Sequence, residues 1–128
     1  MGLAGIVAKG MIKELDYRAR EFYEFVLPAI DMYEEKNDLV VVIDLPGFAK
    51  QDINLKVTGR ILSINARREE PEKVGTVYYR HRPTRISKRI ELPISVRDDE
   101  TVVGNATYEH GVVRLRIPIP QSTSIPIS

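Results

Sequence analysis

Few residues in this chain are equipped for catalysis. Its two histidines are His81, in a basic run, and His110, at a predicted turn, and the chain has no cysteine. Nothing therefore places two imidazoles, or an imidazole and a thiol, at the spacing of a metal site or a nucleophile–base pair. Acids such as Glu69 with Glu70 fall in polar segments, where we expect solvated turns rather than a desolvated catalytic pair. We expect no enzymatic activity, no cofactor and no metal ion.

The densest charged segment runs from residue 78 to residue 89 and combines aromatic rings with cations. Such a segment can bind single-stranded nucleic acid through phosphate contacts and base stacking, so a nucleic-acid-binding β module is one hypothesis. The alternative is that the cations meet Asp31, Glu34, Glu35 and Asp38 across a subunit interface. The formal net charge of only +1 favours the interface, and no nucleic-acid partner is expected. The residues concerned are Tyr78, Tyr79, Arg80, Arg82, Arg85, Lys88 and Arg89.

The composition is that of one domain with short extensions. The chain has 128 residues, 43% of them hydrophobic and 29% charged, a size that supports one core without disulfides. Residues 1–8 are apolar, but Lys9 and Lys13 interrupt them long before the roughly 20 residues that a membrane span requires. No basic leader segment is visible either. A soluble, cytoplasmic protein is the expectation.

Residues 3–27 have the pattern of an amphipathic helix that ends before Pro28. Apolar residues recur at spacings of four and seven, and a proline ring cannot continue a helix. Because the helix precedes a sandwich that is already complete, its stripe is available to another subunit or to exposed apolar surface on an unfolding protein. The predicted client-binding residues are Leu3, Val7, Met11, Leu15, Phe22 and Val26.

Beyond Pro28 the hydrophobic period changes from about four to two. The run 39–43 is continuously apolar, as in a strand buried on both faces, and Pro46 with Gly47 ends it in a turn. Alternating segments follow at 53–57, 62–66, 86–92, 105–108 and 113–117, with short turns at 58–60 and 109–111. This pattern predicts an all-β, immunoglobulin-like antiparallel β-sandwich with an N-terminal helix and an extended C-terminal tail.

Two segments do not fit the sandwich. Residues 68–82 are too charged for a central strand and contain Pro71, so they should form an excursion away from it. The polar tail ends in Ile125, Pro126 and Ile127, and the proline holds an extended backbone that points both isoleucines to the same side. Burying them contributes roughly 3 to 6 kcal/mol gross, while ordering the tail costs about 1 to 2 kcal/mol per residue. The tail should be a weak, reversible latch.

Several motifs occur in order along the chain. They are residues 28–34 before the 39–43 strand, Asp44-Leu45-Pro46-Gly47-Phe48, Leu92-Pro93 after a strand, the segment from Ala106 through Gly111 and Val113 to Leu115, and Ile125-Pro126-Ile127. Together they resemble the small heat-shock protein family, whose shared module is the α-crystallin domain, over residues 28–127. The resemblance implies a variable helical arm at 1–28, an α-crystallin domain at 29–120 and a C-terminal extension with an Ile-X-Ile motif at 121–128.

The resemblance also implies an activity. Members of the family are holdase chaperones that bind unfolding proteins and prevent their aggregation without hydrolysing ATP, which matches a chain without a phosphate-cradling glycine loop. Their non-metazoan dimers exchange a loop strand, so residues of the excursion should pair with an edge strand of the partner. The loop residues are Val77, Tyr78, Tyr79, Arg80 and Arg82, and the edge residues are Ile30, Asp31, Met32 and Tyr33.

Assembly beyond the dimer is implied as well. The tail isoleucines should enter a groove on a neighbouring dimer and so build a large homo-oligomer. By this analogy the groove is lined by Ile53, Leu55, Val57, Ala106 and Tyr108.

Overall fold

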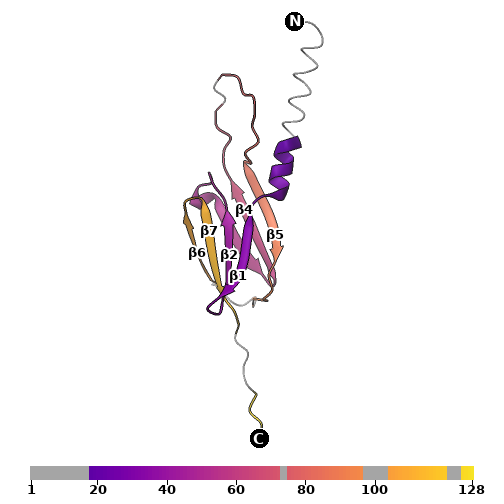
Figure 1. Ribbon diagram of the computed structural model, residues 1–128, viewed down its shortest axis with the longest axis vertical. Coiled ribbons are helices and arrows are strands. Elements are labelled where there is room, and N and C mark those ends of the chain that lie inside the picture. Colours follow the sequence, from indigo (N-terminus) through magenta and orange to yellow (C-terminus); the bar gives the residue numbers. More distant parts are fainter. Residues whose placement is uncertain (1–17, 73–74, 97–103, 121–124) are drawn as a thin grey trace.

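Two antiparallel sheets pack face to face in the computed structural model, which describes residues 18–72, 75–96, 104–120 and 125–128 (Figure 1). One sheet has the strand order β1-β2-β7-β6 and the other the order β3-β4-β5. The strands are β1 (Ile30–Glu35), β2 (Asp38–Asp44), β3 (Ile53–Thr58), β4 (Ile61–Arg67), β5 (Arg85–Glu91), β6 (Asn105–Glu109) and β7 (Val112–Pro118), with a 3-10 turn at Lys50–Asp52 before β3. The predicted all-β sandwich is confirmed.

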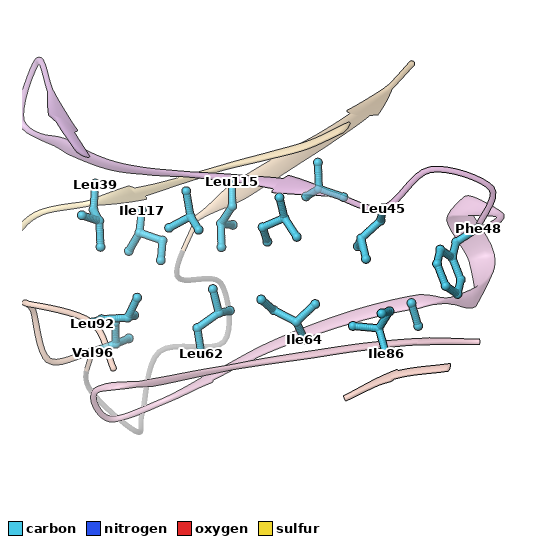
Figure 2. Close-up of a cluster of buried hydrophobic side chains, with 14 residues drawn as sticks. Leu39, Leu45, Phe48, Leu62, Ile64, Ile86, Leu92, Val96, Leu115 and Ile117 are labelled. Atoms are coloured by element: carbon cyan, nitrogen blue, oxygen red, sulfur yellow. The ribbon is translucent and has the colours of Figure 1, made fainter. Parts of the chain in front are cut away.

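The core lies between the facing sides of the two sheets (Figure 2). Alternation along β2 and β7 points every second side chain inward, and β4 and β5 do the same from the other sheet. Burial of these aliphatic side chains is the main favourable term holding the sheets together. The buried cluster comprises Leu39, Val41, Ile43, Leu45, Phe48, Leu62, Ile64, Ala66, Ile86, Leu92, Val96, Val113, Leu115 and Ile117.

Strand β2 is buried on both faces, as its continuous apolar run predicts. Val40 points away from the core and is nevertheless fully buried. The strand register places it between Tyr33 of β1 and Arg116 of β7. Long side chains can cover an apolar neighbour with their stems while their polar ends stay in water. The outer face of β2 is therefore covered at Val40, while Val42 on the same face is half-buried.

The hydrophobic pattern did not reveal β1. Ile30 and Met32 pack against the core, but acidic and polar residues follow them at once and hide the alternation. The turn to β2 uses Lys36 and Asn37, both with positive φ, at 51° and 66°. That is the backbone of a type I′ hairpin turn, which matches the twist of the flanking strands.

The helical arm is anchored where it meets the sandwich. Residues 18–26 are helical, while the first part of the predicted 3–27 helix lies outside the described residues. The N–H of Leu27 donates to the carbonyl oxygen of Tyr23 at 2.9 Å, and Leu27 packs against the core. The Lys88 ammonium donates to the Phe25 carbonyl oxygen at 3.2 Å, a cation at the negative end of the helix.

Candidate functional site

Strand β1 has an open edge. It is the outermost strand of its sheet and pairs only with β2 among the described strands. The N–H of Asp44 donates to the carbonyl oxygen of Ala29 at 3.1 Å, so residue 29 is a hydrogen-bonded partner of β2. Because bonded and non-bonded pairs alternate in an antiparallel ladder, the backbone groups of Ile30, Met32 and Glu34 face outward. This edge can accept a further strand.

The predicted excursion leaves the sandwich between β4 and β5 and extends beyond its end (Figure 1). Residues 77–82 form no strand within the chain. Tyr78 is 77% exposed and Tyr79 is 73% exposed. The loop thus presents two tyrosine side chains largely to solvent, while Val77, Arg80 and His81 beside them are half-buried.

An apolar groove of about 250 Å³ lies where the edge strands β3 and β6 meet. Four of the five predicted groove residues, Ile53, Leu55, Ala106 and Tyr108, line it. Val57 is not among the lining residues, although it lies on the same face of β3 and packs against the core. The groove therefore extends less far along β3 than the resemblance implies. Its remaining walls come from Lys50, Thr107 and Val113.

Tyr108 fixes one wall of this groove. Its hydroxyl lies 2.7 Å from the carbonyl oxygens of both Leu45 and Phe48 and donates its proton to one of them at a time. Since the phenol is held by the loop after β2, the ring cannot swing out of the groove without breaking this bond. The groove is preformed within the single chain.

Five exposed apolar side chains lie on the described helix and in the C-terminal tail. Ile125 and Ile127 are 87% and 98% exposed, and the tail extends away from the sandwich (Figure 1). Phe22 and Val26 on the helix are also exposed. Phe25, which is not among the predicted client-binding residues, has a larger exposed fraction than either of them. The other stripe residues, Leu3, Val7, Met11 and Leu15, lie outside the described residues.

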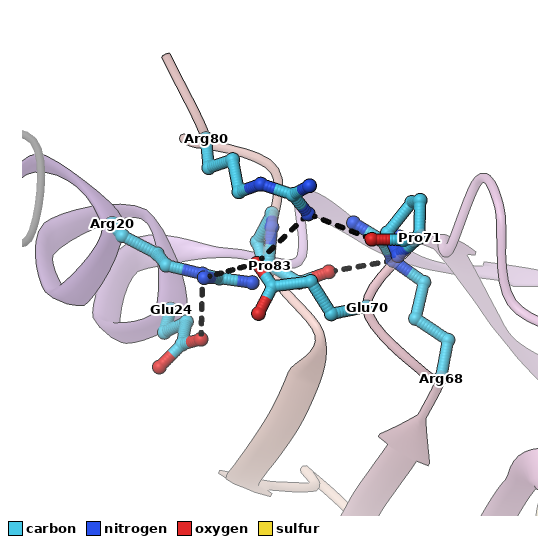
Figure 3. A network of polar contacts seen from close by, with 7 residues as sticks. All are labelled: Arg20, Glu24, Arg68, Glu70, Pro71, Arg80 and Pro83. Atoms are coloured by element: carbon cyan, nitrogen blue, oxygen red, sulfur yellow. Dashed lines mark hydrogen bonds and ion pairs between the residues drawn. The ribbon is translucent and has the colours of Figure 1, made fainter. Parts of the chain in front are cut away.

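Glu70 connects the helix to the loop (Figure 3). Its Oε1 accepts a hydrogen bond from Arg20 Nη1 at 2.7 Å, and Arg80 Nη1 lies 3.3 Å from the same oxygen. Close by, the rings of Tyr23 and His81 have centroids 6.0 Å apart. Glu70 is exposed, in line with the expected solvated segment, and in addition the helix and the far end of the loop bring arginines to it.

The charge of Glu70 sustains this connection. The hydrogen bond from Arg20 is the largest of the effects that lower the pKa of Glu70, and the positive charge of Arg80 adds to it. The carboxylate is therefore ionised at neutral pH. The contribution of the Glu70 carboxylate to folding stability is fully present above the ordinary carboxyl pKa. It is lost as the pH falls through the lowered pKa of Glu70.

Part of the predicted charge pairing across an interface is satisfied within the chain. Arg116 Nη2 lies 3.4 Å from a Glu35 oxygen, and Arg116 Nη1 lies 3.5 Å from an Asp38 oxygen. Arg80 lies beside Glu70, as described above. The sequence pattern missed Arg20 and Arg116 because each belongs to an element where charged residues alternate with apolar ones and give no signal of their own.

The described residues contain no group of three or more His, Cys, Asp or Glu that could hold a metal ion. None of their helices is long and apolar enough to cross a membrane.

Comparison with known proteins decides the family. The model of the Hsp20/alpha crystallin family matches residues 31–128. The chain belongs to the Hsp20/alpha crystallin family. Heat shock protein HSP.16.4 of Streptococcus thermophilus is 31% identical over 106 residues, covering 76% of this chain and 72% of that protein. Membership of this family supports a chaperone role.

Solved structures of the family share the fold. A mutant of hsp14.1 from Sulfolobus solfatataricus P2 is 43% identical, with a TM-score of 0.74 and coverage of 99% of this chain and 98% of that one. A small heat-shock protein from Xylella fastidiosa is 28% identical, with a TM-score of 0.58 and coverage of 80% and 94%. The resemblance inferred from the motifs is confirmed.

The Glu70 connection can be tested by limited proteolysis with trypsin. Glu70→Gln removes the charge that Arg20 and Arg80 share, so cleavage after Arg18 and Arg20 should become about two- to fivefold faster, the range expected for an exposed ion pair. Glu69→Gln is the matched control, because it removes the neighbouring charge and should leave the rate unchanged. Equal rates for the wild type and Glu70→Gln would show that Glu70 does not hold the helix.

Proposed function

We propose that this protein is an ATP-independent holdase that assembles from strand-exchanged dimers into a large oligomer. The observation that carries the proposal is that β1 has an open backbone edge, while residues 77–82, which carry the exposed Tyr78 and Tyr79, join no strand of the described part of the chain. An exposed edge is a template for pairing with another chain, and proteins normally cover it. A loop from a second copy supplies the cover.

The exchanged strand runs along the outward groups of β1. The backbone of Ile30, Met32 and Glu34 bonds the loop segment of the partner, an addition of one strand to a sheet edge. Asp31 and Tyr33 lie on the outer face, where Arg114 Nη1 already donates to the Tyr33 hydroxyl at 2.9 Å. The exposed Tyr78 and Tyr79 of the loop gain apolar contact in this arrangement, and the cations Arg80 and Arg82 come close to the acidic β1.

The tail binds the groove of a neighbouring dimer. Ile125 and Ile127 are spaced to reach adjacent positions, and the groove presents Ile53, Leu55 and Ala106. The chain's own tail extends away from the sandwich, which leaves it available to another subunit (Figure 1). The Xylella fastidiosa relative, whose structure is described as having a distinct high order structure, supports assembly beyond the dimer.

Client proteins bind the helical arm. Phe22, Phe25 and Val26 form an exposed apolar surface, and the predicted stripe continues through Met11 toward residue 3. Exposed apolar surface of this kind binds the apolar segments that unfolding proteins present. We assign the arm to residues 1–28, the α-crystallin domain to 29–120 and the extension to 121–128. The activity is non-enzymatic and uses no cofactor.

The tail latch is tested by particle mass. Replacing both isoleucines, Ile125→Ala with Ile127→Ala, removes most of the roughly 3 to 6 kcal/mol of gross apolar burial and should convert the large particle to dimers in light scattering. The double valine variant at the same positions is the control and should keep most of the assembly. An unchanged mass in the alanine variant would contradict the latch.

The client surface is tested by suppression of aggregation of a heated model client. Phe22→Ser with Phe25→Ser removes the largest exposed rings of the helix and should reduce suppression severalfold, while the particle mass is checked in parallel. Glu21→Ser, on an exposed position of the same helix, controls for the helix propensity of serine. If the double variant still suppressed aggregation fully, clients would bind the sandwich and not the helix.

A further inference from the structure

A cavity of about 280 Å³ lies between the helix, the end of β4 and the loop. Four arginines line it, namely Arg20, Arg68, Arg80 and Arg82, while Glu70 is its only lining carboxylate. Figure 3 shows Arg20 on the helix together with Arg68, Glu70 and Arg80 of the loop. The cavity is distinct from the apolar groove and from the β1 edge.

The positive charge of this cavity is not balanced by its own acid. Glu70 is shared between Arg20 and Arg80, and Glu24 lies 3.8 Å from Arg20 Nε, beyond hydrogen-bond distance. That Nε atom is buried and has no hydrogen-bond partner. The Nε–H group of Arg68 donates a hydrogen bond to a neutral acceptor, the carbonyl oxygen of Pro83, at 2.8 Å. The described lining therefore carries a clear excess of cations.

Arg68 and Arg82 line this cavity and also a neighbouring one that contains Asp44 and Phe48, and Cζ of Arg68 lies 5.9 Å from the centroid of the Phe48 ring. Burial, followed by the positive charges of Arg82 and Arg20, lowers the pKa of Arg68. A Cβ at Gly47 would lie 2.7 Å from Arg82 Nη2, so the glycine makes room for that guanidinium against the turn after β2. Like charges kept together in a partly desolvated hollow raise its affinity for an anion.

The donor set indicates the class of anion. Guanidinium groups bind phosphate and carboxylate oxygens through paired N–H donors, and several of them around one hollow suit a ligand with many oxygens and more than one charge. A single carboxylate, such as Glu70, neutralises only one cation. A polyvalent phosphate group can accept hydrogen bonds from several of the arginines at once.

We propose that this arginine-lined cavity binds a polyvalent phosphate oxyanion, as free pyrophosphate or as the phosphate chain of a nucleotide. The bound anion lies beside Glu70 and bridges the same two elements, the helix through Arg20 and the loop through Arg80 and Arg82. It therefore ties the client-binding arm to the loop. The site lies within a single chain, and its lining includes Arg80 and Arg82 of the loop segment proposed for strand exchange.

The test is calorimetric titration of the full-length protein with pyrophosphate at low ionic strength. Arg68→Gln and Arg82→Gln should each weaken binding at least tenfold, because each removes a charged donor. Arg89→Gln, at an exposed position on β5 outside the cavity, is the matched control and should bind as the wild type does. Glu70→Gln should bind more tightly, because the competing carboxylate is gone.

A second readout uses the same trypsin assay. Pyrophosphate should restore slow cleavage after Arg20 in Glu70→Gln, since the anion replaces the lost carboxylate as a bridge, and it should have no effect in Glu70→Gln combined with Arg68→Gln. If adenosine diphosphate binds as tightly as pyrophosphate, the phosphate chain is the part of the nucleotide that the cavity recognises. Binding of the nucleotide alone contradicts the proposal, because its base and not the arginines would then be recognised.

Absence of pyrophosphate binding to the wild type overturns the proposal. Equal weakening by Arg89→Gln and Arg68→Gln also overturns it, because the effect would then be one of overall charge.

Discussion

Both sheets of this sandwich end in edge strands that have a neighbour on one side only. The assembly proposed above depends on how these edges are covered. The strand orders leave β1 and β6 at the edges of one sheet and β3 and β5 at the edges of the other. Unpaired backbone groups at such edges favour pairing with another chain. One side offers the backbone of β1 to a strand, and the other offers apolar side chains between β3 and β6 to a tail. The dimer and the higher assembly proposed above thus use different chemistry at opposite edges.

The charged residues add a connection between the arm and the loop. Arg20 and Arg80 meet at Glu70, and the excess of arginines around them forms a hollow suited to an anion. The helix presents apolar rings, while the loop is the segment proposed to enter the partner. We therefore expect a change in charge at this point to affect both the helix proposed to bind clients and the loop segment proposed for strand exchange.

The sequence could predict what depends on local periodicity. Alternation placed Leu62, Ile64 and Leu115 in the core, and the proline after residue 27 marked the end of the helix. The groove residues came from the resemblance, and the structure brings four of the five together. Strand β1 was hidden by its acids, and the role of Glu70 could not be predicted, because its partner Arg20 lies 50 residues away and is brought close only by tertiary structure.

Hydrogen–deuterium exchange of the assembled protein tests the central claim most directly. Within the chain, the amides of Ile30, Met32 and Glu34 face outward from β1 and have no strand partner among the described residues. If a partner's loop covers this edge, these amides and those of residues 77–82 should be protected together in the assembled particle. Fast exchange of both segments in a particle shown to be oligomeric would contradict strand exchange.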